Sequence, residues 1–138
     1  MGLNKGYVRK INKKEFKESI YDYTFNKEWN YKGDQPAVID FYADWCKPCK
    51  VVSPILNELS EDYKGQVKFY KLSTEKDPQV AKVFGIKSIP TLLFIPVEGK
   101  PVFVKGAQSK HMIRKNIEKI LPGAKKGFSL KNIFSGKR

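Results

Sequence analysis

Cysteine and histidine are scarce in this chain, whose 138 residues include two cysteines and one histidine. A tetrahedral zinc site needs four ligands, and Cys46, Cys49 and His111 supply at most three, so we predict no metal site from this chain alone. A disulfide kept only for stability explains the cysteines poorly, because closing so short a loop constrains the unfolded chain very little. Redox chemistry is the favoured interpretation, with metal binding and a structural bridge as the alternatives.

Long apolar segments are also absent from the sequence. No run approaches the roughly 20 apolar residues needed to cross a membrane. The basic N-terminus, MGLNKGYVRK, is not followed by the apolar region of a signal peptide. We therefore expect a cytoplasmic protein without a transmembrane segment. A periplasmic or otherwise exported domain that has lost its leader is the alternative.

Acidic residues are few relative to basic ones. The chain has 27 lysines and arginines against 14 acidic residues, a net charge of +13. Such a charge attracts acidic surfaces of any kind, so we expect no specific nucleic-acid partner. The length suits one domain, which we place at residues 1–121. Residues 122–138 should form a flexible basic tail, because their few apolar side chains do not offset an ordering cost of roughly 1–2 kcal/mol per residue.

Hydrophobic periodicity and capping residues predict alternating strands and helices. Asn12 and Glu15 have capping-box spacing at the start of a helix that should reach about Tyr23. We expect the strand after helix 77–84 to run parallel to the strand before it, through a right-handed crossover. The predicted strands span residues 7–11, 37–43, 67–72, 91–95 and 101–105, and the predicted helices span residues 12–23, 46–63, 77–84 and 109–121.

The stretch AVIDFYADWCKPCK, residues 37–50, carries the clearest chemical signal. Its apolar part predicts a buried strand that contains one acid, Asp40. The motif Cys46-Lys47-Pro48-Cys49 follows where a helix begins, and there unpaired N–H groups and the positive end of the helix dipole favour a thiolate at Cys46. Cys49 lies one turn further on, close enough to close a disulfide. Strand, Cys-x-x-Cys and helix in this order predict a dithiol redox site.

This stretch resembles the thioredoxins when it is taken together with Pro54, Ser88-Ile89-Pro90-Thr91 and Val104-Lys105-Gly106-Ala107. These motifs occur in the family's order and spacing over roughly residues 7–121. The resemblance implies an α/β thioredoxin fold, with a central mixed sheet of four to five strands and helices on both faces. It also implies a protein-disulfide oxidoreductase whose Cys46–Cys49 disulfide is redox-active and which needs no other cofactor.

The comparison with the family also shows departures. The loop over residues 24–35 is longer than a thioredoxin needs. We expect its Trp29 and Tyr31 to pack against the core and hold the loop there, and contact with a partner is the alternative. Lys47 stands where typical thioredoxins carry glycine, and Lys105 stands where many carry an apolar residue. We expect both lysines to border the substrate groove and make it more cationic than usual. Lysines that point into solvent are the alternative.

Thiol–disulfide exchange needs an attacking thiolate and a second thiol that resolves the intermediate. Cys46, expected to be the more exposed cysteine, fits the attacker, and Cys49 behind it fits the resolving thiol. By resemblance, Asp40 matches the family's buried aspartate and would act as the base for Cys49 through a water, because a buried thiol ionises poorly. Lys71 matches the lysine that accompanies this aspartate and would set its charge state; a solvated lysine is the alternative.

Pro90 resembles the family's cis-proline. A cis bond there would leave the backbone of Ile89 free to pair with an extended substrate strand. The other residues expected at the rim of the substrate groove are Trp45, Lys47, Pro48 and Gly106.

The favoured function is reduction of protein disulfides by a monomer that a thioredoxin reductase or another dithiol donor regenerates. The runner-up is an exported thiol–disulfide oxidoreductase that oxidises or isomerises disulfides. A third hypothesis is a non-enzymatic binding module on a thioredoxin fold, with the basic tail as its contact. Cys46, Cys49, Asp40 and Pro90 together argue against this third hypothesis, because a scaffold has no need of all four.

Overall fold

The computed structural model describes residues 7–124, which form a five-stranded sheet and four helices. Within this range no helix is long and apolar enough to span a membrane. In chain order the elements are β1 (Val8–Lys10), α1 (Lys13–Ser19), β2 (Ala37–Tyr42), α2 (Lys47–Asp62), β3 (Lys68–Ser73), α3 (Pro78–Phe84), β4 (Thr91–Ile95), β5 (Val102–Lys105) and α4 (Lys110–Ile120).

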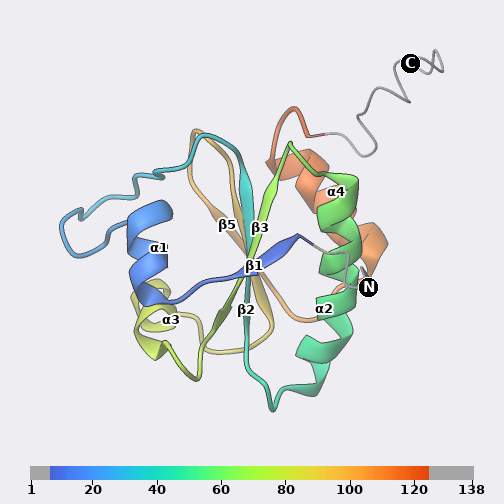
Figure 1. Cartoon of the computed structure of the whole chain (residues 1–138), viewed down its shortest axis with the longest axis horizontal. Coiled ribbons are helices and arrows are strands. Elements are labelled where there is room, and N and C mark those ends of the chain that lie inside the picture. The colour runs from blue at the N-terminus through green and yellow to red at the C-terminus, as the bar shows by residue number, and fades with distance from the viewer. Residues whose placement is uncertain (1–6, 125–138) are drawn as a thin grey trace.

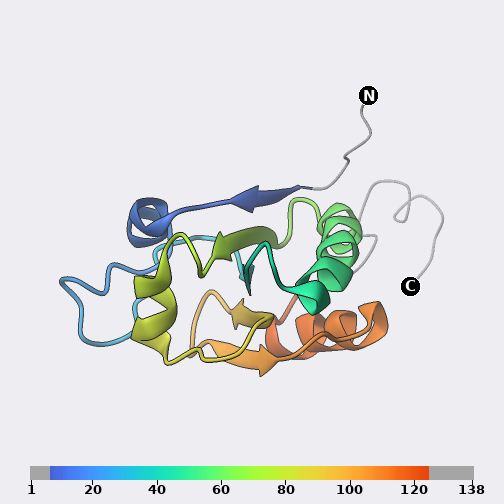
Figure 2. The ribbon, with the colours of Figure 1, turned by 90° about the horizontal axis from the view of Figure 1, so that it is seen from below.

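The sheet is mixed, with the strand order β1-β3-β2-β4-β5. β1 and β2 lie parallel to β3 on its two sides, whereas β4 runs antiparallel to β2 and β5 runs antiparallel to β4. Figure 1 shows the sheet between two layers of helices, with α1 and α3 on one side and α2 and α4 on the other. Figure 2 shows the strands following one another across the molecule from β1 to β5. The expected fold class is confirmed.

The direction of β4 contradicts our prediction of a parallel pair around α3, because β4 runs antiparallel to β2 while β3 runs parallel to it. A parallel return needs a connection along the full length of a strand. The 16 residues of α2 provide roughly 24 Å, whereas the seven residues of α3 span only about 10 Å. Thr91 at the start of β4 therefore pairs with Phe41 near the end of β2. The segment before β4 is thereby placed beside the cysteines.

β2 is buried along its whole length because helices cover both faces of the sheet. Its side chains alternate between two apolar clusters. Val38 packs with the helices α2 and α4, whereas Ile39 and Phe41 lie in the cluster that includes residues of α1 and α3. Asp40 and Tyr42 share the face of Val38, since side chains alternate along a strand. The one acid of the strand is therefore directed toward α2.

Helix α1 is shorter than predicted. Asn12 and Glu15 form the expected capping box, but the helix ends at Ser19, about four residues early. The side chain of Asp22 accepts a hydrogen bond from the Thr24 N–H at 3.0 Å. Such a local side-chain bond offers the backbone an alternative to the helical ladder at residues 22–24, which were predicted to be helical.

The loop over residues 24–35 is held to the core by aromatic residues, as predicted. The ring of Trp29 lies 4.9 Å from that of Tyr21 and stacks on Tyr31 at 6.4 Å, centroid to centroid. Trp29 also contacts Phe84 of α3, at 6.1 Å. The loop is thus linked to α3 on the side of the sheet that faces away from α2.

The predicted tail lies almost wholly outside the described residues, so its flexibility stays a prediction. Ala124 is 6% exposed, packs in the cluster with α2 and α4, and donates its N–H to the Leu121 carbonyl at 3.2 Å. The truncation that tests the tail is therefore best made after Ala124.

We expect a chain truncated after Ala124 to melt within about 3 °C of the full chain, because the deleted residues would bury little apolar surface. Thermal unfolding followed by circular dichroism measures this. The control is truncation after Ile120, which also removes the fully buried Leu121. That loss should lower the melting temperature by roughly 10 °C. A similar drop for truncation after Ala124 would show that the tail belongs to the folded domain.

Candidate active site

The two cysteines lie where β2 leads into α2. Cys46 is the N-cap residue of α2, and its Sγ accepts a hydrogen bond from the Cys49 N–H at 3.2 Å. Pro48 lies in the first turn, where its missing N–H costs no helical hydrogen bond. The two sulfurs are joined in a disulfide, with Cα atoms 5.3 Å apart. A Cys-x-x-Cys pair at a helix N-terminus is thereby confirmed.

The expected difference in exposure between the cysteines is not found. Cys46 and Cys49 are each 3% exposed in this disulfide form. Trp45, immediately before them, is 68% exposed, and Lys47 and Pro48 are also exposed. The rim of the site is therefore open to solvent, whereas the sulfurs are shielded within it.

The segment before β4 supplies part of that shield. The Ile89–Pro90 peptide bond is cis, as predicted. The carbonyl oxygen of Ile89 lies 3.8 Å from Cys46 Sγ. The Pro90 carbonyl accepts a hydrogen bond from the Gly106 N–H at 2.8 Å, and Gly106 has a φ of 92°, a conformation that glycine adopts without strain. The segments that carry the predicted groove residues thus meet around the disulfide.

Asp40 and Cys49 line one cavity of about 140 Å³, together with Ser53 and Lys71. Asp40 is 2% exposed, and its Oδ1 atom has no hydrogen-bond partner among the described residues. Burial raises the pKa of Asp40 to about 7, and the positive charge of Lys71 acts in the opposite direction. A carboxyl group with a pKa near neutrality can both accept and return a proton at physiological pH.

Lys71 is the neighbour of Asp40 across the parallel pair of β2 and β3. Its Nζ lies 5.4 Å from the centroid of the Tyr42 ring, a cation–π contact. Sequence reasoning missed Tyr42, which also lines the Asp40 cavity. The available signal was its spacing, because a residue two positions after Asp40 lies on the same face of the strand.

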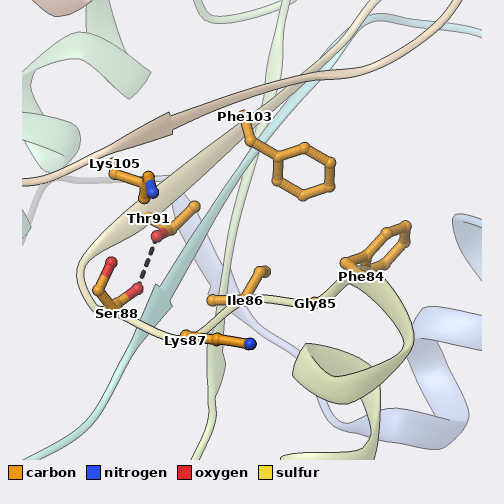
Figure 3. A pocket seen from close by; sticks show the side chains of 8 residues that line it. All are labelled: Phe84, Gly85, Ile86, Lys87, Ser88, Thr91, Phe103 and Lys105. Atoms are coloured by element: carbon orange, nitrogen blue, oxygen red, sulfur yellow. Dashed lines mark hydrogen bonds between the residues drawn. The ribbon is translucent and has the colours of Figure 1, made fainter.

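The two lysines expected at one groove lie in different places. Lys47 is exposed in the first turn of α2, beside the disulfide. Lys105 instead lines a separate pocket next to α3, which it shares with Ser88 and Phe103 (Figure 3). Whether both lysines border one substrate groove therefore stays a prediction.

The thioredoxin family model matches residues 8–119, a range that includes both cysteines, Asp40 and Pro90. The chain belongs to the thioredoxin family. The thioredoxin of Borreliella burgdorferi is 47% identical over 91 residues, which cover 66% of this chain and 78% of that protein. Thioredoxin 1 of Nostoc is 39% identical over 102 residues, 74% of this chain and 94% of that protein. The match to the chloroplastic M-type thioredoxin of Brassica napus, at 43% identity, spans only 51% of that longer relative.

Among solved structures, chloroplastic thioredoxin z matches with a TM-score of 0.69 at 23% identity, covering 82% of this chain and 93% of that one. This likeness shows the thioredoxin fold. Family membership, with the Cys46–Cys49 disulfide, makes the protein a protein-disulfide oxidoreductase that works by thioredoxin-type dithiol–disulfide exchange. Membership also implies disulfide substrates and a donor that reduces the Cys46–Cys49 disulfide.

Proposed function

We propose that the protein reduces protein disulfides, with Cys46 as the attacking thiolate, Cys49 as the resolving thiol and Asp40 as the base for Cys49. The observation that carries this proposal is the cavity of about 140 Å³ that Asp40 and Cys49 share. It is large enough for water. Oδ1 of Asp40 has no hydrogen-bond partner among the described residues. A water there can pass the Cys49 proton to Asp40. Lys71 lowers the pKa of Asp40 and so keeps part of the carboxyl ionised near pH 7.

The reaction moves two electrons from the dithiol to the substrate in two exchanges. First, the Cys46 thiolate attacks one sulfur of the substrate disulfide, which breaks that bond and releases one substrate thiolate. Next, Cys49 gives its proton to Asp40, and its thiolate attacks Cys46 Sγ in the mixed disulfide. The Cys46–Cys49 disulfide forms, and the second substrate thiolate leaves. Both substrate thiolates take up protons, and an external dithiol donor then reduces the protein.

Reduction of insulin tests the proposal. With dithiothreitol as the donor, the protein is expected to accelerate precipitation of the insulin B chain. The variant with serine at both Cys46 and Cys49 is the matched control and should leave only the uncatalysed rate. If the unaltered protein also gave only the uncatalysed rate, reductase function would be wrong, and a non-enzymatic binding module would become the better hypothesis.

An exported oxidant or isomerase is the second candidate, and Lys47 shifts the expected reduction potential in the oxidising direction, although not far enough to make the protein an oxidant. A positive charge beside Cys46 stabilises the thiolate, hence the reduced form, and raises the reduction potential. At an effective dielectric constant near 80, a charge about 6 Å away contributes roughly 0.7 kcal/mol, and partial burial increases this. The expected potential is therefore roughly 15–30 mV above the value of about −270 mV for thioredoxin. This remains a reducing potential.

Lys47→Gly is expected to lower the reduction potential by roughly 15–30 mV and to raise the pKa of the Cys46 thiol. Equilibration with thiol–disulfide buffers measures the potential, and iodoacetamide labelling against pH measures the pKa. Lys47→Gln is the matched control for loop stiffness, because it removes the charge and keeps a long side chain. Unchanged values in both variants would refute the electrostatic effect. A potential near −120 mV in the unaltered protein would instead favour an oxidant.

We further propose a monomeric protein in the cytoplasm, regenerated by a thioredoxin reductase or another dithiol donor, with no cofactor besides its disulfide. What supports these inferences is family membership. Sedimentation of the purified protein, cell fractionation and an NADPH-coupled reductase assay test them separately. Recovery in a periplasmic fraction would overturn the compartment without affecting the chemistry.

A further inference from the structure

A second pocket, of about 290 Å³, lies beside the disulfide on the face of the sheet that α3 covers. The end of α3, the loop before β4 and the edge strand β5 form its walls (Figure 3). The lining residues used below are Phe84, Ile86, Lys87, Ser88, Phe103 and Lys105. Of the residues predicted to border the substrate groove, Lys105 alone lines this pocket, whereas Trp45, Pro48 and both cysteines do not.

Two edges of the pocket begin next to the disulfide. Ser88 directly precedes Ile89, whose carbonyl oxygen lies 3.8 Å from Cys46 Sγ. Lys105 directly precedes Gly106, which donates its N–H to the Pro90 carbonyl. Adjacent Cα atoms are about 3.8 Å apart. An extended substrate chain advances roughly 3.3 Å per residue, so a side chain about two to four residues from the reacting cysteine can reach the pocket.

One wall of the pocket is a fixed aromatic surface. The rings of Phe84 and Phe103 lie 5.5 Å apart, centroid to centroid. Phe103 is 39% exposed, so part of its ring remains available to a ligand. Phe84 is held from behind by Phe16, Tyr21, Trp29 and Phe41, at centroid distances of 5.7, 6.4, 6.1 and 6.5 Å. Because these contacts already order the wall, little side-chain freedom is lost when an apolar group binds.

The opposite side of the pocket is cationic. Figure 3 shows the two phenyl rings on one side and Lys105 on the other, next to Thr91 and Ser88. Neither Lys87 nor Lys105 forms a salt bridge with a described residue, and no acid lines the pocket within residues 7–124. An apolar wall that faces unpaired ammonium groups complements an aromatic side chain with a carboxylate beside it.

We propose that this pocket is a specificity site for protein substrates: it binds an aromatic side chain roughly two to four residues from the reacting cysteine, and Lys87 and Lys105 bind a carboxylate next to that side chain. This inference rests on the disulfide reductase function proposed above. It extends that function to a substrate class, acidic segments that carry an aromatic residue close to a disulfide.

Synthetic peptides test the specificity site directly. Each probe is a ten-residue peptide with one cysteine, joined as a mixed disulfide to 2-mercaptoethanol, and reduction is followed by quench and chromatography. The test peptides carry Phe-Asp three residues before or three residues after the cysteine. Matched peptides carry Ala-Asp or Phe-Lys at the same places. In at least one arrangement, Phe-Asp is expected to raise kcat/KM roughly tenfold over Ala-Asp and about threefold over Phe-Lys.

Protein variants assign the preference to the pocket. Phe103→Ala is expected to remove the preference for the aromatic peptide. Val102→Ala is the matched control, because Val102 and Phe103 are both 39% exposed on β5 but only Phe103 lines the pocket. Lys105→Gln should remove the preference for Asp over Lys in the peptide, whereas Lys68→Gln, at an exposed lysine of β3, should keep it.

Hydroxyethyl disulfide, a small uncharged substrate, separates failure of this inference from failure of the proposed function. The two control variants, Val102→Ala and Lys68→Gln, should reduce it at the rate of the unaltered protein, and circular dichroism checks that Phe103→Ala and Lys105→Gln fold. Two outcomes would refute the specificity site while leaving the reductase function intact, provided that hydroxyethyl disulfide is reduced normally. One is that every peptide reacts equally fast. The other is that Val102→Ala loses the aromatic preference as Phe103→Ala does. If even this small disulfide is not reduced, the reductase function fails and the specificity site fails with it.

Discussion

Serine in place of Cys46 is expected to abolish disulfide reduction, and serine in place of Cys49 is expected to trap mixed disulfides with substrates. Cys46 is the N-cap of α2, where the helix N-terminus stabilises a thiolate. Without this nucleophile the rate should fall by roughly a thousandfold or more. With Cys46 present and the thiol at position 49 missing, the first exchange proceeds but the mixed disulfide is not resolved.

Non-reducing electrophoresis against insulin distinguishes the two variants. Cys49→Ser should give an adduct that dithiothreitol releases, whereas Cys46→Ser should give very little. A brief pulse of iodoacetamide on the reduced protein should label Cys46 first. Equal labelling of both thiols, or equal adducts from both variants, would contradict the assignment of attacker and resolving thiol. This labelling is informative because both cysteines are equally shielded, 3% exposed, in the disulfide form.

Asp40→Asn is expected to stabilise the oxidised protein at alkaline pH while slowing its catalysis. Burial raises the pKa of Asp40 from 3.8 to about 7, so the folded protein holds this proton more tightly than the unfolded chain. The free energy of unfolding is therefore highest below about pH 4, where Asp40 is protonated in both states. It falls as the pH rises through about 7, where Asp40 loses its proton in the folded protein. A shift of this size corresponds to a loss of roughly 4 kcal/mol in the free energy of unfolding at about pH 8.5. Asparagine carries no titrating proton and avoids this loss.

Urea unfolding of the oxidised proteins measures this difference. At about pH 8.5 the Asp40→Asn protein should be more stable by roughly 4 kcal/mol, and at about pH 4 the gap should shrink below about 1 kcal/mol. Oxidised protein is used so that no thiol titrates. Asp44→Asn is the matched control, because Asp44 lines the same cavity but is exposed. A gap of equal size at both pH values would show that Asp40 is not the titrating group.

The same variant tests the base assignment in kinetics. Loss of a general base should slow resolution of a preformed mixed disulfide by roughly a hundredfold near pH 7. The defect should lessen at high pH, where Cys49 ionises without help. Resolution at the rate of the unaltered protein would refute the role of Asp40 while leaving the stability result to stand on its own.

Much of the redox site could be predicted from sequence because its signals are local. Cys46 and Cys49 are three residues apart, and the acid Asp40 lies within an apolar run, so strand, N-cap and helix follow from neighbouring residues. The cis bond before Pro90 was predicted through the family resemblance, and the structure contains it. The order and approximate limits of the strands and helices could likewise be predicted from the hydrophobic periodicity of the sequence.

Features that depend on packing between distant segments could not be predicted from the sequence in this way. The direction of β4 is set by where β3 ends and how far α3 reaches, which periodicity does not report. The cation–π contact between Lys71 and Tyr42 depends on the register of two strands. The pocket between Phe84 and Phe103 joins a helix end to an edge strand. In each case the missing information is the position of residues distant in sequence.

The contact between Cys46 and Ile89 has a consequence for synthesis of the protein. These residues are 43 positions apart, so the ribosome makes the sulfur well before the carbonyl that shields it. At about 5–20 residues per second, the delay is roughly 2–9 s. During this interval the nascent dithiol is open to any oxidant in its surroundings. Because the two cysteines join within one turn of α2, a disulfide formed on the nascent chain is already the native one and does not obstruct later folding.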